Sequence, residues 1–353
     1  MWLFHQDFPK VVQQAWFEDR DLQEATLDFV VKAKKWNCVV FRNLFAKKKR
    51  ILARLHGTQK ALANNSNEFL LELEQQLISQ YSLILMQEEE YWALKSRLNT
   101  ATFGDCNTSF FHVSTLVRRH RNKIRCIKDR KGNWLIDEIV VKDHIQDGFK
   151  KLYRTELEVI PIDSDVSRFS FCFLEEEDRT RIDGDVTDGE IQTGLWALKP
   201  FKALGPNGLH AGFYQHFWME VKESMYKEVK GIFHKGCMLK FLNETLISLI
   251  PKCKNPESLS NYRPISLCNS ICKVVSKILV AQIRPLLGKL ISPVQIAFVP
   301  DRRCTNNVMI AQEFFHALDK KKGTIGFMAI KLDLEKAYDR LEWSFIYRVL
   351  QAF

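Results

Sequence analysis

The residues with the clearest chemical potential lie near the end of the chain, in the segment FMAIKLDLEKAYDRLEW (residues 327–343). The apolar run at 327–332 predicts a buried strand, and Asp333 stands at its end. A carboxylate in that position is well placed to hold Mg²⁺, which prefers oxygen ligands. Tyr338 is expected at the start of a helix that buries three apolar side chains at every fourth position, Leu341, Phe345 and Val349. Asp333 could instead be only a helix N-cap.

A second segment with chemical potential is strongly basic. Eight Lys and Arg residues fall within fourteen positions, against the single acid Asp129: Arg118, Arg119, Arg121, Lys123, Arg125, Lys128, Arg130 and Lys131. Alternating residues and the turn DRKGNW predict a β-hairpin from about Lys123 to Ile136. Lys and Arg bind polyanions by releasing counterions from phosphates, so the segment predicts a nucleic-acid surface. The alternative is a solvated face, in which these charges would repel each other.

Composition supports a folded, basic protein. The 353 residues are 46% hydrophobic and carry a net charge of +10, which suits a nucleic-acid partner, although charge can also serve solubility. The nine cysteines include no Cys-x-x-Cys pair, which predicts reduced thiols; a metal clip at Cys268 and Cys272 is the less favoured alternative. No signal peptide, targeting signal or membrane span is recognisable, so we expect an intracellular protein of the nucleus or cytoplasm.

The first hundred residues are predicted to form long helices. Apolar residues recur at helical spacing from Leu22 to Leu55, and Gly57 is predicted to end that helix. A second amphipathic helix is predicted from near Ser66 to Leu98. Two such helices joined by a short polar turn are expected to form an antiparallel hairpin.

An acidic stretch then separates two predicted domains. Residues 161–186 are expected to form a flexible linker between a helical connector with a basic β-hairpin at 1–160 and a second domain at 187–353. Thr187 and Glu190 form a capping-box pattern that predicts the start of a helix. That helix carries three apolar residues, Ile191, Leu195 and Leu198.

Four segments follow in order within residues 187–353. The first is LKPFKALGPNGLHAGFYQHFW (198–218), in which two lysines, Lys199 and Lys202, stand beside a Gly-Pro-Asn-Gly turn. The second is LISLIPKCKNPESLSNYRPISLCNSICKVVSKIL (246–279). Its apolar strand is predicted to end at Pro251, and YRPISL leads into a helix with four apolar residues on one side, Val274, Val275, Ile278 and Leu279. The third is ISPVQIAFVPDR (291–302), and the fourth contains Asp333.

Together, these segments resemble the reverse transcriptase of non-LTR (LINE-type) retrotransposons, in the version found in plants. KPFKALGPNG, LIPK…NYRPISL, SPVQIAFVPDR and KLDLEKAYDRLEW match consecutive motifs of that family in order and spacing. GDCNTSFFH (104–112) and KDRKGNW (128–134) resemble its connector to an endonuclease. The resemblance covers essentially the whole chain. It implies an α+β fold in which the fingers and the first part of the palm of a polymerase follow a region of long helices.

The resemblance also implies roles for individual residues. Asp333 would be the first catalytic carboxylate and would bind both Mg²⁺ ions of a phosphoryl transfer. Tyr338 would exclude a 2′-hydroxyl group, and Lys252 and Arg263 would contact the incoming deoxynucleoside triphosphate. The template and nucleotide pocket would be shaped by Gln295, Phe298 and Arg302. The expected partners are an RNA template and a DNA primer or target, contacted by Lys199, Lys202, Arg118, Arg119, Arg121, Lys123 and Arg125.

The sequence departs from the family pattern at several points. The turn reads Ala-Leu-Gly-Pro-Asn-Gly (203–208) where the family usually has Ala-Pro-Gly-Pro-Asp-Gly, and Asn306 replaces a usual Asp. The later palm motifs are absent, and no two aspartates are adjacent. A two-metal site needs several carboxylates, so the truncated chain is predicted to be inactive alone. The alternatives are a non-catalytic nucleic-acid-binding remnant of a retroelement and, least favoured, an unrelated basic scaffold.

Overall fold

The structure is a computed structural model that describes residues 2–17, 20–41, 43–65, 67–96, 108–154, 174–320, 328–333 and 337–351. Its contacts divide the chain into two compact units. Unit 1 contains residues 1–124, 187–256 and 260–275, and unit 2 contains 125–186, 257–259 and 276–353. The division follows spatial contacts rather than chain order, so the domains predicted at 1–160, 161–186 and 187–353 stay a prediction.

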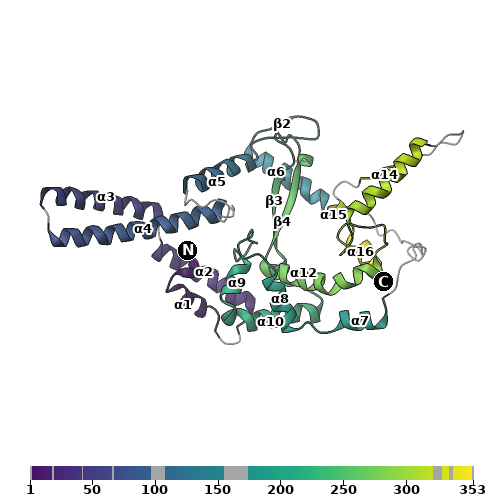
Figure 1. Ribbon diagram of the computed structural model, residues 1–353, viewed down its shortest axis with the longest axis horizontal. Helices are drawn as coiled ribbons and strands as arrows, with labels where there is room; N and C mark the ends of the chain where they lie inside the picture. Colours follow the sequence, from purple (N-terminus) through teal and green to yellow (C-terminus); the bar gives the residue numbers. More distant parts are fainter. Residues whose placement is uncertain are drawn as a thin grey trace. The chain divides into compact units, whose positions relative to one another are not determined.

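Unit 1 is helical apart from one antiparallel β-ribbon of strands β3 and β4 (Figure 1). Its elements are the 3₁₀ turn η1 (Trp2–Phe4), α1 (Phe8–Gln13), α2 (Leu22–Val40), α3 (Leu44–Asn64), α4 (Glu68–Ser96), α5 (Thr108–Asn122), α8 (Asp188–Trp196), α9 (Ala211–His216), α10 (Trp218–Lys235), α11 (Lys240–Asn243), β3 (Thr245–Pro251) and β4 (Tyr262–Cys268). Helix α12 (Ser270–Ile283) begins in unit 1 and continues into unit 2.

Unit 2 contains a short β-hairpin of β1 and β2, followed by helices. Its elements are β1 (Ile127–Lys128), β2 (Trp134–Leu135), α6 (Glu138–Leu152), α7 (Glu176–Asp183), η5 (Arg284–Leu286), α13 (Leu287–Leu290), α14 (Cys304–Lys320), α15 (Ala337–Arg340) and α16 (Trp343–Gln351). A further 3₁₀ turn, η4 (Leu259–Asn261), falls where the units divide. The described residues therefore combine helices with small antiparallel sheets, in agreement with the predicted α+β class.

Helices α3 and α4 lie side by side and confirm the predicted helical hairpin (Figure 1). Their shared core consists of Ile51, Leu77 and Ile84, and Lys48 Nζ lies 2.6 Å from Glu88 Oε2 across the pair. The single helix predicted from Leu22 to Leu55 is wrong, because α2 ends at Val40 and the Asn43 side chain caps the start of α3.

The predicted helix end at Gly57 is also wrong. Helix α3 continues through Gly57 to Asn64, and Thr58, the next residue, is buried. A glycine in a helix interior costs only about 1 kcal/mol relative to alanine. Packing of α3 against α4 therefore outweighs the local preference.

An aromatic cluster joins the N-terminal helices of unit 1 to α9 and α10. The ring of Phe29 lies 4.7 Å from that of Phe213 and 5.4 Å from that of Trp16, measured between centroids. Phe8 lies 5.7 Å from Phe217 in the same way. All five side chains are buried. Residues near positions 8–29 and 213–217 thus share one core, although nearly two hundred residues of chain separate them.

The capping box predicted at the start of α8 is present. The Thr187 hydroxyl accepts from Glu190 N at 3.2 Å, and Glu190 Oε2 accepts from Thr187 N at 2.9 Å. Ile191 and Leu195 lie on α8 and are buried, but α8 ends at Trp196, so the placement of Leu198 on this helix is wrong. Within the stretch predicted to be a linker, residues 176–183 form helix α7, which the sequence did not predict. Residues 155–173 lie outside the described part of the chain.

The predicted β-hairpin near Lys123 to Ile136 is confirmed, but its strands are only two residues long. Ile127 pairs with Leu135, and Lys128 pairs with Trp134. The basic run that precedes it is divided, because Arg118, Arg119 and Arg121 lie on α5. The sequence did not predict that helix.

Two expectations of burial near the fourth segment are wrong, one for a strand and one for the helix that follows it. The described residues 328–333 lie in no strand, and Met328, Ile330 and Leu332 are exposed. Leu341 and Phe345, expected to be buried, are exposed, and Val349 is only half-buried. A buried strand needs neighbouring strands to satisfy its backbone groups, and the described residues provide none to this run. On α12, Val274, Val275 and Ile278 are buried as predicted, whereas Leu279 is exposed.

Within the described residues, no helix is long and apolar enough to cross a membrane.

Candidate nucleotide and nucleic-acid sites

The turn of the first motif is a defined structural feature of unit 1. Gly208 N donates to Gly205 O at 3.1 Å, and Gly208 adopts a φ of +74°, which favours glycine. The Asn207 side-chain oxygen accepts from Leu209 N at 3.1 Å. Lys199 and Lys202 are exposed just before this turn. The turn therefore presents two cations beside a rigid backbone, as a template contact would need.

Asn269, between β4 and α12, holds this turn in place. Its side-chain nitrogen donates to the carbonyls of Phe241 and Leu242 at 3.0 and 3.1 Å. Its side-chain oxygen accepts from Asn207 N at 3.1 Å, and the residue is fully buried. A Cβ added at Gly205 would lie 2.6 Å from Asn269 N, so only glycine fits there. The first and second motifs are thus in contact.

The sequence missed Asn269. An asparagine ahead of a helix is a common N-cap signal, and nothing in its spacing reveals partners more than twenty residues away. Two neighbours reinforce the same contact. Ser270 Oγ donates to Leu209 O at 2.9 Å, and Lys273 Nζ donates to Ala203 O at 3.2 Å.

Lys252 and Arg263 lie at the loop end of the β3–β4 ribbon. Ile250 pairs with Arg263, and Lys252 N donates to Asn261 O at 2.8 Å just beyond the strand. Lys252 follows the last residue of β3, and Arg263 is the second residue of β4. Both cations are exposed. The ribbon therefore gathers two of the residues predicted to contact a triphosphate.

Arg302 in unit 2 fixes the loop of the third motif. Its guanidinium donates to the carbonyl oxygens of Ile291, at 2.8 Å, and of Ser292 and Gln295. Three bonds from one planar fork hold the backbone of the loop in a single shape. The role visible in the structure is structural, and whether Arg302 also contacts a nucleotide stays a prediction. The Gln295 side chain donates to Ala297 O at 3.3 Å within the same loop.

The same loop holds Phe298 in an unusual conformation. Phe298 has a φ of +67°, which is uncommon for a residue other than glycine. The residue is 84% exposed. Its ring meets the ring of Tyr338 edge-on, with centroids 6.2 Å apart. Tyr338 stands in the first turn of α15, as predicted, and is 78% exposed. The single helix predicted from Tyr338 to Val349 is wrong, because α15 ends at Arg340 and α16 begins at Trp343. Strained backbone of this kind concentrates at functional sites. Phe298 and Tyr338 are both predicted to border the nucleotide.

Asp333 is exposed and lies outside any helix or strand. Reverse transcriptases generally depend on divalent metal ions. Among the described residues, however, no three His, Cys, Asp or Glu side chains are grouped closely enough to hold a metal. One exposed carboxylate does not fit a two-metal centre. Lys252 and Arg263 belong to unit 1, whereas Asp333, Phe298 and Tyr338 belong to unit 2.

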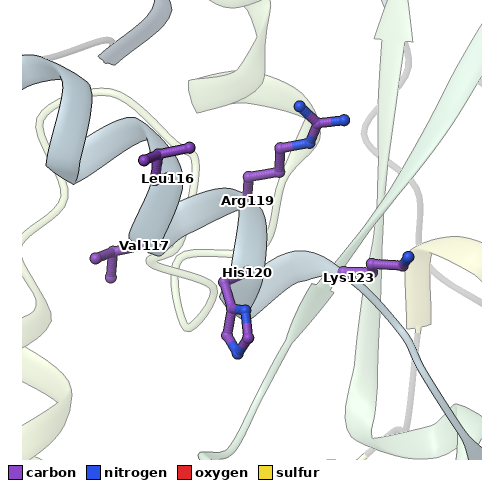
Figure 2. Close-up of a pocket in the computed structure, with 5 residues that line it drawn as sticks. All are labelled: Leu116, Val117, Arg119, His120 and Lys123. Atoms are coloured by element: carbon purple, nitrogen blue, oxygen red, sulfur yellow. The ribbon is translucent and has the colours of Figure 1, made fainter.

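The end of helix α5 forms a basic surface. Five residues line a pocket of about 510 Å³ there, and Figure 2 shows their side chains around the last turns of the helix: Leu116, Val117, Arg119, His120 and Lys123. Arg119, Arg121 and Lys123 are exposed. We call these three residues the α5 basic face. It combines exposed cations with apolar side chains, as surfaces that follow a nucleic-acid backbone do.

Not every cation of the basic run is equally available. Arg118 donates to the carbonyls of Lys95 and Ser96, the last two residues of α4, and so satisfies helix-end groups. Lys128 Nζ bonds to Glu257 Oε2. Arg125 is exposed and follows α5 in the sequence, before strand β1. The structure thus gives Arg118 and Lys128 structural partners, and their contact with nucleic acid stays a prediction.

Comparison with known proteins points to one family. The profile of the reverse transcriptase (RNA-dependent DNA polymerase) family matches residues 250–353. A curated relative, the transposon TX1 uncharacterized 149 kDa protein of Xenopus laevis, is 25% identical over 263 residues. That alignment covers 74% of this chain, which spans only 20% of the relative's length. The plant version of the family stays a prediction. Residues 250–353 are therefore similar to the reverse transcriptase family, and the predicted resemblance of this chain to the reverse transcriptases of non-LTR retrotransposons is confirmed.

Proposed function

We propose that residues 187–353 form the fingers and the first part of the palm of an RNA-directed DNA polymerase from a LINE-type retrotransposon, in its plant version. The observation that supports the proposal is the β3–β4 ribbon, which pairs Ile250 with Arg263 and ends one residue before Lys252, at the start of the segment that matches the family profile. In this proposal the chain binds an RNA template, a DNA primer or target, and deoxynucleoside triphosphates.

Each candidate residue has a distinct proposed role. Lys252 and Arg263 bind the triphosphate, because charge-assisted bonds to phosphate are strong and an arginine fork matches phosphate geometry. Tyr338, supported by the ring of Phe298, borders the sugar. Asp333 is proposed as one catalytic carboxylate. Gln295 and Arg302 shape the loop beside the nucleotide, and Lys199 and Lys202 approach the template.

Photocrosslinking of a deoxynucleoside triphosphate tests the nucleotide site. The unmodified chain is incubated with a primer–template and a photoreactive thymidine triphosphate, and the apparent affinity is measured with and without Lys252→Ala or Arg263→Ala. Loss of a bond to a charged group costs about 1.5–3 kcal/mol, which corresponds to a fall in affinity of roughly tenfold or more. Lys254→Ala, in the same loop, is the matched control. Equal effects of all three substitutions would refute the assignment.

Primer extension tests catalysis separately. We expect the 353-residue polypeptide, assayed alone with Mg²⁺ or Mn²⁺, not to extend a primer on an RNA template. The reason is that two divalent ions about 4 Å apart repel each other unless several carboxylates neutralise them, and Asp333 is only one. Extension by the unmodified chain that Asp333→Ala abolishes would contradict this expectation.

The second candidate function is nucleic-acid binding without catalysis, and the α5 basic face favours it. Three exposed cations near one helix end would release about three counterions on binding. On single strands the slope of log affinity against log salt is about −0.7 per phosphate neutralised. Replacing Arg119, Arg121 and Lys123 with alanine should flatten that slope by about 2. An unchanged slope would assign the α5 basic face to ordinary solvated surface.

A further inference from the structure

The turn of the β1–β2 hairpin is fixed by its own hydrogen bonds. Asp129 Oδ1 accepts from Lys131 N and from Asn133 N, both at 2.8 Å. Asp129 N donates to Asn133 O at 2.9 Å, and Gly132 adopts a φ of +89°. The bonds from Asn133, followed by those from Lys131 and Gly132, hold the pKa of Asp129 below its usual range. The tip of the hairpin is therefore preorganised, and it presents Arg130 and Lys131 to solvent.

Trp134 stands directly beside this tip and is 47% exposed. Lys128, its partner across the hairpin, places Nζ 4.8 Å from the centroid of the indole ring. That ammonium is also bonded to Glu257, and Lys128 N donates to Glu257 O at 2.6 Å. Lys128 is thus held by a carboxylate on one side and by the ring on the other. It fixes the indole from one face, while nearly half of the residue's surface remains open to solvent.

Charge and geometry together favour one kind of ligand. Four cations and one acid occupy residues 125–134, which suits a polyanion better than an apolar or basic partner surface. A flat, fixed aromatic face can stack on any base, because every base has a π-face. Bases inside a duplex already stack on each other, so a free base requires a single strand. Indole and flanking cations then match the alternating bases and phosphates of such a strand.

We propose that Trp134 is a stacking platform for a base of single-stranded RNA or DNA, with Arg130 and Lys131 contacting the neighbouring phosphates. The inference deepens the nucleic-acid-binding part of the proposed function and rests on it. It assigns the contact with a base to Trp134, an uncharged residue that a search for basic residues does not find. It also gives Lys128 a positioning role in place of a phosphate contact.

Fluorescence anisotropy with labelled 12-nucleotide strands tests this proposal on the full 353-residue chain. Single-stranded RNA, single-stranded DNA of the same sequence and the corresponding duplex are compared. Trp134→Ala is expected to lower single-strand affinity about tenfold, since one base–aromatic stack contributes about 1–3 kcal/mol. Trp134→Phe should retain most of the affinity, and duplex affinity should not change. The RNA and DNA arms show which strand is preferred.

Ile136→Ala is the matched control, because Ile136 lies in the same hairpin and is apolar and 75% exposed, but has no π-face. Equal losses for Trp134→Ala and Ile136→Ala, or equal losses on single strand and duplex, would overturn the proposal. A second measurement needs no variant: a strand carrying 5-iodouridine is photocrosslinked to the unmodified chain, and the linked residue is identified by mass spectrometry. A crosslink at Trp134 is expected, and a map without it would refute the stack.

The outcomes also separate this inference from the proposal on which it rests. If the unmodified chain binds single strands with the salt slope expected for the α5 basic face, and Trp134→Ala is neutral, only the stacking platform fails. If the unmodified chain binds no nucleic acid at low salt, both proposals fail together.

Discussion

In unit 1 the apolar faces of α2 and α10 are buried, whereas in unit 2 most large apolar side chains of α14 and α16 are exposed. Helix α2 buries Phe29 in the aromatic cluster, and α10 buries Val221, Met225 and Val229. Neither α14 nor α16 has a buried side chain among the described residues. The exposed apolar residues of these two helices are Val308, Met309, Ile310, Phe314, Phe315, Trp343, Phe345, Tyr347 and Leu350.

The difference teaches that an amphipathic pattern specifies a face but not its partner. A short helix is marginal in water by itself, and most of its stability comes from packing. Unit 1 supplies that packing through contacts between distant parts of the chain. In the described part of unit 2, α14 and α16 show the same kind of pattern without it. We therefore expect substitutions in the two regions to differ sharply in cost.

The largest expected effect is at Phe29. Phe29→Ala removes a buried ring that contacts Trp16 and Phe213, and should lower the free energy of unfolding by about 3–5 kcal/mol. Phe345→Ala, at an exposed position of α16, should change it by less than about 0.5 kcal/mol. Urea denaturation followed by circular dichroism measures both. If the two substitutions lower the free energy of unfolding by similar amounts, Phe345 on α16 is packed against other residues in solution.

The second prediction concerns buried polar bonds. Asn269→Ala leaves the Phe241 and Leu242 carbonyls and the Asn207 amide without their partner, and should cost about 2–3 kcal/mol of unfolding free energy. Asn307 on α14 is the control, because its side chain donates to Val294 O at 3.3 Å in an exposed setting. Asn307→Ala should cost under about 0.5 kcal/mol. If Asn269→Ala leaves the free energy of unfolding unchanged, the turn at 205–208 does not depend on the hydrogen bonds of the Asn269 side chain.

A smaller contrast is expected between neighbouring arginines on α5. Arg118→Ala removes the bonds to the α4 carbonyls and should destabilise the chain by about 1–2 kcal/mol. Arg119→Ala should leave stability within about 0.5 kcal/mol and instead weaken nucleic-acid binding. Thermal unfolding and anisotropy, run on the same two variants, separate the roles. Equal destabilisation by Arg118→Ala and Arg119→Ala would contradict a structural role for Arg118 and a binding role for Arg119.

The smallest effect is a pH dependence in unit 1. The hydrogen bond from Lys32, with that from Arg20, holds the pKa of Asp28 below its ordinary value of 3.8. The folded state therefore binds fewer protons than the unfolded state, so this stabilisation is present at neutral pH. It is lost as the pH falls below 3.8 through the folded-state pKa. Asp28→Asn should reduce the acid sensitivity of the denaturation midpoint below about pH 4. An unchanged pH dependence of the denaturation midpoint would mean that other titratable groups cause the acid sensitivity.

Local signals in the sequence determined much of this protein. Helical spacing predicted the α3–α4 hairpin, the Thr187–Glu190 pattern predicted the start of α8, and DRKGNW predicted the β1–β2 turn. These features depend on neighbours within a few residues, so a single sequence displays them. The ordered motifs likewise identified the polymerase family, because motif order does not depend on packing.

Only the tertiary structure decided which residues meet across the chain. It joined Phe8 and Phe29 to Phe213 and Phe217, and it gave Asn269 partners on other elements. It also separated Arg118, which closes a helix end, from Arg119, which faces solvent. The strand predicted at 327–332 failed for the same reason. Burial and hydrogen bonding are properties of pairs of segments, and a local pattern specifies only one member of each pair.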